Sequence, residues 1–307
     1  MKARHGALAG LLATAAIAAG AAPVDIAWMP VDAGPVKSPH GAMLVPVVSG
    51  GIECRMQIDT GMPTTVFYRG AVPTAWLAGS TDTVTAPGLA VGGTPLPDAG
   101  LPFFPGKMAD DGATPCSATN PDVLVGTIGL DSLKTGAIVV DMAAGRFEFI
   151  PHGVLSATAA THASLFKFAD APGAYGSLPL LELIGRAGAR YRMWLDTGNA
   201  PMGASFVRER DWLAETSEAS RSPAFESSSW GRPVTGQVGR GRLEIVSSAG
   251  TNLVISDNIS IHKKPDEIVP DSNPLSGFLG LLPFEKQRLT IDFANRLASV
   301  EPGHANP

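Results

Sequence analysis

The triplet Asp-Thr-Gly occurs twice in this chain, and each copy ends a run of apolar residues that is typical of a β-strand. The first copy, Asp59-Thr60-Gly61, follows Ile58, and the second, Asp196-Thr197-Gly198, follows Leu195. A single triplet of this kind is usually a turn, because Asp and Gly both favour turns. Two copies in the same strand context indicate an internal repeat, so we expect two copies of one structural unit.

The repeat extends to both sides of the triplets. Upstream, an apolar segment with a shared proline precedes each copy, and downstream a Gly-containing segment is followed by a strand-like run that ends in aspartate. That aspartate lies 12 residues after the glycine in both copies. The matched pairs are Val45–Val48 with Leu178–Leu181, Ile128-Gly129-Leu130 with Leu279-Gly280-Leu281, and Asp141 with Asp292.

The paired motifs resemble those of the aspartic peptidases, both the bilobal pepsin-like and the dimeric retropepsin-like families. Each lobe of these families has a hydrophobic pair before Asp-Thr-Gly, and a later hydrophobic-hydrophobic-Gly segment loops behind the aspartate. The corresponding segments here are Gln57–Gly61 with Thr127–Gly129, and Trp194–Gly198 with Phe278–Gly280. Over about residues 43–300, the resemblance implies an all-β fold of two homologous β-barrel-like lobes with a cleft between them.

The chain departs from the pepsin-like pattern at two points. Ser or Thr follows the triplet in pepsin-like lobes, whereas Met62 and Asn199 follow it here. A pepsin-type flap tyrosine is also missing, since Tyr68, Tyr175 and Tyr191 lie outside the expected flap. The Met-Pro pair after the first triplet is closer to bacterial retropepsin-like proteins, so the chain is similar to a fused pair of such lobes.

The resemblance implies that Asp59 and Asp196 are the catalytic residues. The ionised carboxylate would take a proton from a water, and the neutral one would donate to the carbonyl oxygen of the scissile bond. The resemblance also implies supporting roles for the rest of the triplets. Thr60 and Thr197 would hydrogen-bond across the lobe interface, while Gly61 and Gly198 would let backbone N–H groups approach the carboxylates.

The residues after the triplets predict a difference between the two aspartates. The Asn199 amide can hydrogen-bond the outer carboxylate oxygen of Asp196 and favour its ionised form, whereas Met62 offers no such bond to Asp59. We therefore expect Asp196 to ionise more readily, Asp59 to hold the proton, and activity to peak in the weakly acidic range.

The N-terminus predicts a secretory signal over residues 1–22. Lys2 and Arg4 precede a short run rich in Ala and Leu, and Ala19-Gly20-Ala21 fits the rule for cleavage at small residues. The apolar run is too short to favour a stable transmembrane span. We therefore expect a periplasmic or secreted protein without a membrane anchor.

The mature chain is predicted to be globular and rich in short strands. Its composition of 45% hydrophobic and 17% charged residues excludes disorder, and 35 Gly with 26 Pro favour many turns. We expect a hairpin in each lobe, around Gly92-Gly93 and around residues 247–250, a strand at 165–168 and a short helix at 211–215. The expected units are a lead-in (23–42), an N-terminal lobe (43–151), a connector (152–176), a C-terminal lobe (177–300) and a tail (301–307).

Two features leave alternatives open. Cys54 and Cys116 form a disulfide in the exported protein, or Cys54 is a buried free thiol. A flap over the substrate is expected near Trp76–Pro87 or Ser228–Gly241, and a surface loop is the alternative for either stretch.

The leading functional hypothesis is an exported aspartic endopeptidase that acts as a monomer on peptide or protein substrates and uses no cofactor. The six histidines show no metal-ligand spacing, and a net charge of −5 without basic clusters gives no sign of nucleic-acid binding. The alternative is a catalytically inactive peptide-binding protein on the same fold. A β-sandwich that binds carbohydrate is a weaker third hypothesis, because it leaves the paired triplets unexplained.

Overall fold

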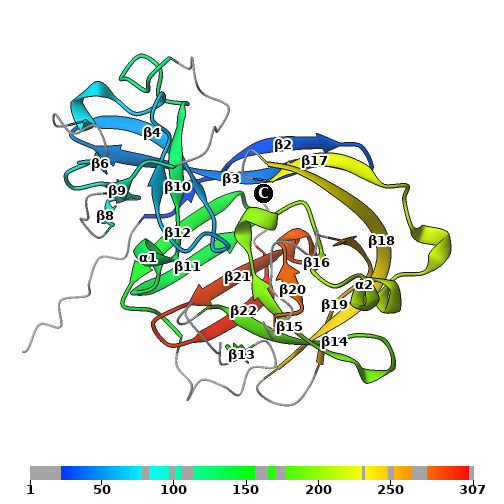
Figure 1. Ribbon diagram of the computed structural model, residues 1–307. Coiled ribbons are helices and arrows are strands. Elements are labelled where there is room, and N and C mark those ends of the chain that lie inside the picture. Colours follow the sequence, from blue (N-terminus) through cyan, green and yellow to red (C-terminus); the bar gives the residue numbers. More distant parts are fainter. Residues whose placement is uncertain are drawn as a thin grey trace, which may run out of the picture.

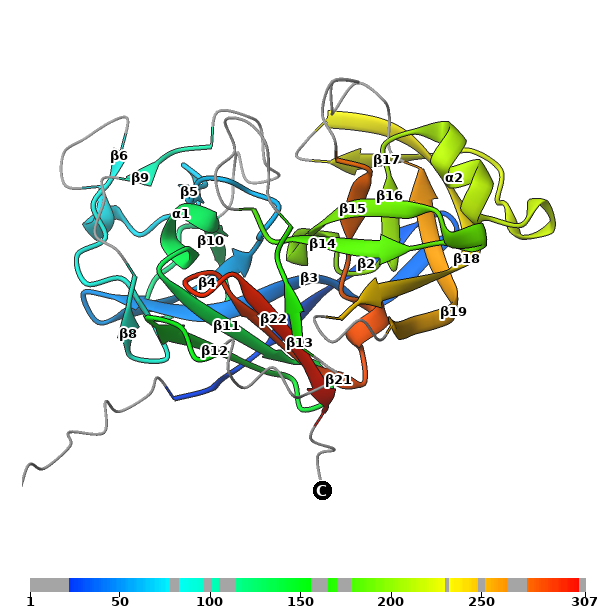
Figure 2. The same cartoon turned by 90° about the horizontal axis from the view of Figure 1, so that it is seen from below.

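The computed structural model describes residues 22–77, 83–96, 101–104, 114–155, 165–169, 178–229, 232–247, 252–263 and 275–303. Strands dominate these residues, and the helices are short. The strands form two lobes side by side, with a further sheet that contains strands from both lobes (Figures 1 and 2). The prediction of an all-β fold with two lobes is confirmed. The expected signal sequence lies outside the described residues except for Ala22.

A seven-stranded sheet forms the N-terminal lobe, in the order β5-β10-β4-β3-β7-β8 with β2 paired to β3. Its strands are β2 (Ala27–Ala33), β3 (Val36–Ser49), β4 (Ile52–Ile58), β5 (Val66–Phe67), β7 (Ala90–Val91), β8 (Thr94–Pro95) and β10 (Leu124–Ile128). Side chains alternate between core and surface along β4, where Cys54, Met56 and Ile58 are buried. β7 and β8 form the expected hairpin around Gly92-Gly93, where both glycines have positive φ.

A second seven-stranded sheet forms the C-terminal lobe, in the order β14-β15-β20-β16-β19-β18-β17. Its strands are β14 (Leu180–Ile184), β15 (Arg190–Leu195), β16 (Ala204–Phe206), β17 (Phe225–Ser229), β18 (Arg232–Val246), β19 (Asn252–Lys263) and β20 (Gly277–Leu279). β18 and β19 pair from Val246 and Asn252 onward, which confirms the second expected hairpin. The expected helix is α2 (Glu209–Glu215), with Trp212 buried.

The two lobes repeat one arrangement of three strands around their aspartates. In the first lobe β10 lies parallel to β4 and antiparallel to β5. In the second lobe β20 lies parallel to β15 and antiparallel to β16. β10 and β20 therefore have equivalent neighbours in the same directions, as expected for a duplicated unit.

The third sheet joins the lobes (Figure 2). Its strands, in spatial order, are β1 (Val24–Asp25), β12 (Arg146–Pro151), β11 (Gly136–Asp141), β21 (Gln287–Asp292), β22 (Leu297–Pro302) and β13 (Leu165–Lys167). The repeated strands β11 and β21 pair with each other at its centre, with Ile138 opposite Ile291. β13 occupies one edge, as expected for the segment 165–168. Asp141 and Asp292, the repeated aspartates, each accept a backbone N–H in the turn that follows, from Ala144 at 3.0 Å and Asn295 at 2.8 Å respectively.

Two details of the sequence-based repeat differ in the structure. Residues 24–42, expected as a lead-in, form β1, β2 and the first half of β3, since β2 and β3 pair as a long hairpin. The upstream match through the shared prolines is wrong. Leu44 pairs with Gln57 and Leu180 with Trp194, so Leu44 and Leu180 are the equivalent residues. Strand register fixes this correspondence, whereas a shared proline does not.

The two cysteines form a disulfide. The S–S distance is 2.03 Å and the Cα–Cα distance 6.0 Å, both within the usual range for a bridge. Cys54 on β4 and Cys116 are also buried, so the bridge lies in the core of the N-terminal lobe. It joins segments 62 residues apart in sequence, and the free-thiol alternative is wrong.

Candidate active site

Asp59 follows the end of β4, and Asp196 follows the end of β15. A backbone hydrogen bond to a neighbouring strand of the same lobe fixes each of them. The Asp59 N–H donates to the Ile128 carbonyl of β10 at 3.1 Å. The Asp196 N–H donates to the Leu279 carbonyl of β20 at 2.8 Å. The two Gly-containing segments that the sequence matched therefore take equivalent positions behind the aspartates.

The two triplets meet through their threonines where the lobes touch. The Thr60 hydroxyl donates to the Leu195 carbonyl at 2.6 Å, and the Thr197 hydroxyl donates to the Ile58 carbonyl at 2.9 Å. Each hydroxyl also accepts the backbone N–H of the other threonine, at 3.0 Å in both directions. Both threonines are fully buried, so water does not compete for these four bonds.

The glycines place each carboxylate against the opposite lobe. Gly61 N–H donates to Asp59 Oδ1 at 2.8 Å, and Gly198 N–H donates to Asp196 Oδ1 at 2.9 Å. A Cβ on Gly61 would overlap the Asp196 carboxylate, and a Cβ on Gly198 would overlap the Asp59 carboxylate. The structure thus brings all six residues of the two triplets into one cluster.

Burial strengthens the interaction between the two carboxylates. Asp59 is 3% exposed and Asp196 is 6% exposed. Two adjacent carboxylates shielded from water repel each other when both are ionised, so the pair favours a state that holds one proton. Such a pair contains an acid and a base in one place, as general acid–base catalysis requires.

The residue after the second triplet is used differently from the sequence-based expectation. The Asn199 side-chain amide donates to Ser205 Oγ at 2.9 Å, and the Ser205 hydroxyl lies 3.3 Å from Asn199 Oδ1. Ser205 follows on β16, so this pair ties the turn to its own lobe. The contact with Ser205, which sequence spacing did not reveal, removes the basis for expecting Asp196 to ionise more readily. The weakly acidic optimum stays a prediction.

A buried polar cluster behind the first triplet was missed from the sequence. Thr65 donates its N–H and its hydroxyl to Asp131 Oδ1, at 2.8 and 2.7 Å, and its hydroxyl lies 2.7 Å from Ser132 Oγ. Gly129 N–H donates to the same hydroxyl at 3.0 Å. The cluster fixes the turn after the triplet onto α1 (Leu130–Leu133). The polar pair directly after the Gly-containing segment was the available signal.

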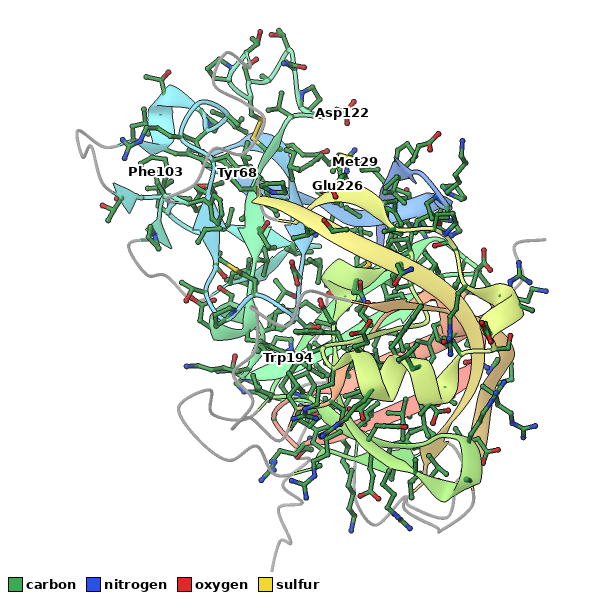
Figure 3. The ribbon with its side chains drawn as sticks, turned by 45° about the vertical axis from the view of Figure 1, so that its right-hand side comes forward. Met29, Tyr68, Phe103, Asp122, Trp194 and Glu226 are labelled. Atoms are coloured by element: carbon green, nitrogen blue, oxygen red, sulfur yellow. A yellow bond between two sulfur atoms is a disulfide. The ribbon has the colours of Figure 1, made fainter. Side chains whose placement is uncertain are left out.

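Tyr68 also takes part in this region of the first lobe. Its hydroxyl lies 2.7 Å from Thr127 Oγ1 on β10, and the ring packs edge-on against Phe104. Figure 3 places Tyr68 in the N-terminal lobe and Trp194 in the C-terminal lobe. Thr127 pairs with Gln57, two residues before Asp59, so Tyr68 supports the strands that carry the aspartate.

The fold of this chain is similar to that of the aspartic proteinase from Irpex lacteus. The TM-score is 0.49 with 11% sequence identity, and the match covers 92% of this chain and 97% of that one. No family model matches the chain, and no curated protein matches it.

Trp194 lies on β15, two residues before Asp196. It is 6% exposed, the same fraction as Asp196, and its ring stacks on Phe278 with 6.0 Å between centroids. Its indole Nε1 is buried and has no hydrogen-bond partner in the described part of the chain. Trp194 therefore packs against Phe278 next to the strand end that carries Asp196.

The two flap candidates differ in their described parts. In the first, Trp76 is a core residue, and β6 (Thr83–Val84) pairs with β9 (Leu101–Pro102) as a small separate sheet. In the second, β17 and β18 form a hairpin in which Ser229 pairs with Arg232. Residues 78–82 and 230–231 lie outside the described residues, so a flap at either place stays a prediction.

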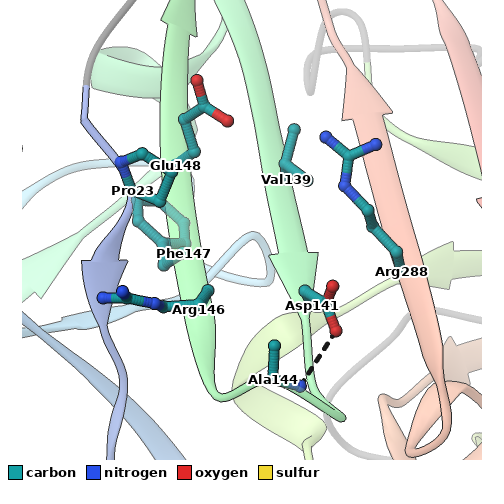
Figure 4. A pocket seen from close by; sticks show the side chains of 8 residues that line it. All are labelled: Pro23, Val139, Asp141, Ala144, Arg146, Phe147, Glu148 and Arg288. Atoms are coloured by element: carbon teal, nitrogen blue, oxygen red, sulfur yellow. Dashed lines mark hydrogen bonds between the residues drawn. The ribbon is translucent and has the colours of Figure 1, made fainter. Parts of the chain in front are cut away.

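A pocket on the joining sheet is lined by neither Asp59 nor Asp196 (Figure 4). Its arginines are engaged elsewhere, Arg146 with Asp25 at 2.7 Å and Arg288 with Glu301 at 3.2 Å. No His, Cys, Asp and Glu side chains in the described ranges form a group able to hold a metal ion. No helix in those ranges is long and apolar enough to cross a membrane. The pocket is lined by Pro23, Val139, Asp141, Ala144, Arg146, Phe147, Glu148 and Arg288.

Proposed function

We propose that this chain is an aspartic endopeptidase that hydrolyses peptide bonds with a water held between Asp59 and Asp196. One observation supports the proposal above all others. The reciprocal bonds of Thr60 and Thr197 join the two triplets, and the buried carboxylate of each lobe lies against the glycine of the other. Two neighbouring carboxylates destabilise a fold, because like charges repel. Peptide hydrolysis explains their presence, since it uses one carboxyl as an acid and the other as a base.

In the proposed mechanism the two aspartates divide the proton chemistry. The ionised carboxylate removes a proton from the water as its oxygen attacks the peptide carbonyl carbon. The neutral carboxyl donates its proton to the carbonyl oxygen, so a tetrahedral intermediate forms without a free oxyanion. Return of a proton to the leaving nitrogen then breaks the C–N bond. The reaction consumes only water and the peptide.

The supporting residues act on the geometry of this pair. The N–H groups of Gly61 and Gly198 donate to Oδ1 of Asp59 and of Asp196, which restrains the orientation of each carboxylate. The threonine hydroxyls connect the two lobes directly at the aspartates. Their role is to hold the reacting groups in place before the substrate binds, which lowers the cost of reaching the transition state.

The second candidate function is peptide binding without catalysis on the same fold. The paired carboxylates favour the enzyme, since binding alone gives no reason to hold two of them together.

We also propose that the protein is exported to the periplasm or secreted, and that it acts as a monomer without a membrane anchor. The buried disulfide supports export, because such bridges persist in oxidising compartments. Both aspartates belong to one chain, which supports a monomer. Activity per mole should stay constant across a dilution series, and N-terminal sequencing of the exported protein should show loss of about the first 22 residues.

Peptide cleavage is the direct test. The purified mature protein is incubated with a mixed peptide library across acidic and neutral pH, and products are identified by mass spectrometry. We expect internal cleavage sites that vanish in the Asp59→Asn variant. Peptides that bind without being cleaved would favour the second candidate function. Cleavage that persists in the variant would mean that another site or a contaminant is responsible.

A further inference from the structure

One long strand connects the surroundings of both aspartates. β3 runs over 14 residues from Val36 to Ser49, whereas its equivalent in the second lobe, β14, has 5 residues. The later half of β3 pairs with β4, which leads directly to Asp59, with Leu44 opposite Gln57. The earlier half pairs with β2 instead. β2 and the earlier half of β3 form a hairpin over residues 27–42, which we call the arm.

The arm leaves its own lobe and packs on the other one. Near its tip Val36, which is 6% exposed, forms a small apolar cluster with Met202 and Val238 of the C-terminal lobe. At the tip, the position of a Cβ on Gly34 would lie 3.4 Å from Phe225 Cβ. Figure 1 shows β2 beside β17, and the two strands are in contact.

A second contact lies closer to the base of the arm. His40 Nδ1 is 3.6 Å from Glu285 Oε1, and the imidazole packs on the Trp28 ring with 4.7 Å between centroids. Trp28 belongs to the same arm, whereas Glu285 belongs to the C-terminal lobe. The arm therefore reaches the second lobe at separate points, one apolar and one polar.

The contacted residues belong to the two segments that hold Asp196. Met202 N–H donates to the Asn199 carbonyl at 3.1 Å, and this carbonyl lies in the turn that begins with Asp196. Glu285 follows η7 (Leu282–Phe284), and Leu282 N–H donates to the Met202 carbonyl at 3.3 Å. Contact with Met202 and Glu285 thus reaches the turn of the second triplet through its own backbone hydrogen bonds.

We propose that the arm is a positioning element that fixes the relative placement of Asp59 and Asp196, with Val36 and His40 as its anchoring residues. One half of β3 determines where β4 delivers Asp59, and the other half presses on the turn that carries Asp196. The arm is not part of the repeated unit, since β14 has no comparable extension, so it adds an asymmetric connection to the symmetric threonine bonds. This inference rests on the proposed function for its effect on catalysis.

Catalysis by a carboxylate pair is sensitive to such placement. A misplacement of about 1 Å in a reacting group can lower the rate by about 100-fold, and the proton shared by the pair depends on their separation. A loosened arm should therefore lower kcat more than it raises KM and should shift the pH profile of kcat/KM. A purely structural contact would lower the melting temperature without moving that profile.

The test compares two valines of similar burial. Val36→Ala shortens the anchor in the arm, and Val300→Ala makes the same change on β22, where the side chain is 5% exposed. Lys37→Ala alters the exposed side of the arm, and Val36→Ile restores an apolar anchor. We expect Val36→Ala, alone or with His40→Ala, to reduce kcat by about 10-fold or more and shift the profile. Val300→Ala and Lys37→Ala should keep the wild-type pH profile of kcat/KM. Val36→Ile should keep most of the wild-type kcat.

A second measurement does not depend on activity. Spin labels at Lys134 and Ala214, two exposed positions in different lobes, report the distribution of distances between the lobes. We expect the variant Val36→Ala/His40→Ala to broaden this distribution, while Val300→Ala leaves it unchanged. If the wild type cleaves no peptide, the proposed function fails, yet the label distances still test the arm. Equal effects of the two valine variants on kcat, profile and distances would overturn the inference.

Discussion

The carboxylate of Asp196 occupies the space that a Cβ on Gly61 would need, although the two residues belong to different lobes. The reverse holds for Asp59 and Gly198. Glycine is required at these positions by close approach, since neither residue has a positive φ. The triplet therefore encodes a contact between the lobes as well as a turn within one lobe.

We expect Gly61→Ala to displace the Asp196 carboxylate, to destabilise the fold by about 1–3 kcal/mol and to abolish cleavage. A double-mutant cycle isolates the cause. In an Asp196→Ala background the added methyl has room, so the loss of stability from Gly61→Ala should be smaller. Chemical denaturation of the four proteins measures this difference. An equal loss of stability in both backgrounds would show that the added methyl group does not clash with the Asp196 carboxylate.

The threonine bonds predict a strict need for a hydroxyl at positions 60 and 197. Valine has nearly the shape of threonine, but at position 60 it removes the donor to the Leu195 carbonyl and the acceptor for the Thr197 N–H, both buried. Thr60→Val should cost about 1–3 kcal/mol in the free energy of unfolding. Thr60→Ser keeps the hydroxyl and serves as the control. The prediction fails if the serine and valine variants lose the same stability and the same activity.

Each aspartate should be indispensable for cleavage and dispensable for folding. Asn keeps the size of Asp and still accepts a hydrogen bond from the glycine N–H, but it neither takes nor gives the catalytic proton. We expect Asp59→Asn and Asp196→Asn each to lower kcat by at least about 100-fold with little change in the melting temperature. Either variant keeping more than a few per cent of kcat would rule out the shared pair.

Tyr191 predicts how stability depends on pH in the alkaline range. Burial, together with its hydrogen bond to the Glu215 carboxylate at 2.8 Å, raises the pKa of Tyr191 far above its usual range. Above about pH 10 the unfolded chain loses this proton while the folded protein keeps it, so the free energy of unfolding falls as pH rises.

The Tyr191→Phe variant removes this titration. It should be less stable than the wild type near pH 8, by about 1–3 kcal/mol, because buried Glu215 loses a donor. The difference should shrink as the pH rises above about 10. Urea denaturation of both proteins across this range gives the comparison, and a difference that stays constant with pH would contradict the pKa assignment.

The disulfide should contribute substantially to the N-terminal lobe. It closes a loop between residues 62 apart in sequence, for which the loss of chain entropy in the unfolded state corresponds to about 4 kcal/mol. The variant Cys54→Ser/Cys116→Ser should therefore unfold at lower denaturant concentration than the oxidised protein. Reduction of the wild type under mild denaturing conditions should reproduce the effect, and no change in either case would show that the bridge adds little.

The sequence by itself determined the features that depend on local pattern and on repetition. Apolar runs that end at Asp59 and Asp196 specify strand ends, because strand and turn preferences are local. The repeated order of segments predicted two lobes of one design, and paired glycines predicted the hairpin of β7 and β8. Equivalent residues in two copies imply symmetry, and the resemblance to the aspartic peptidases supplied the expectation that the two triplets meet.

Only the tertiary structure decided which distant groups meet. The partner of the Asn199 amide is Ser205 on its own lobe, and the partner of the Tyr68 hydroxyl is Thr127, neither of which is signalled by spacing. The arm is a further case. Its sequence predicted only a lead-in to the first lobe, whereas β2 and β3 pair and contact the C-terminal lobe. Contacts of this kind depend on strand register and packing across the whole chain, so they emerge only when all the strands are in place.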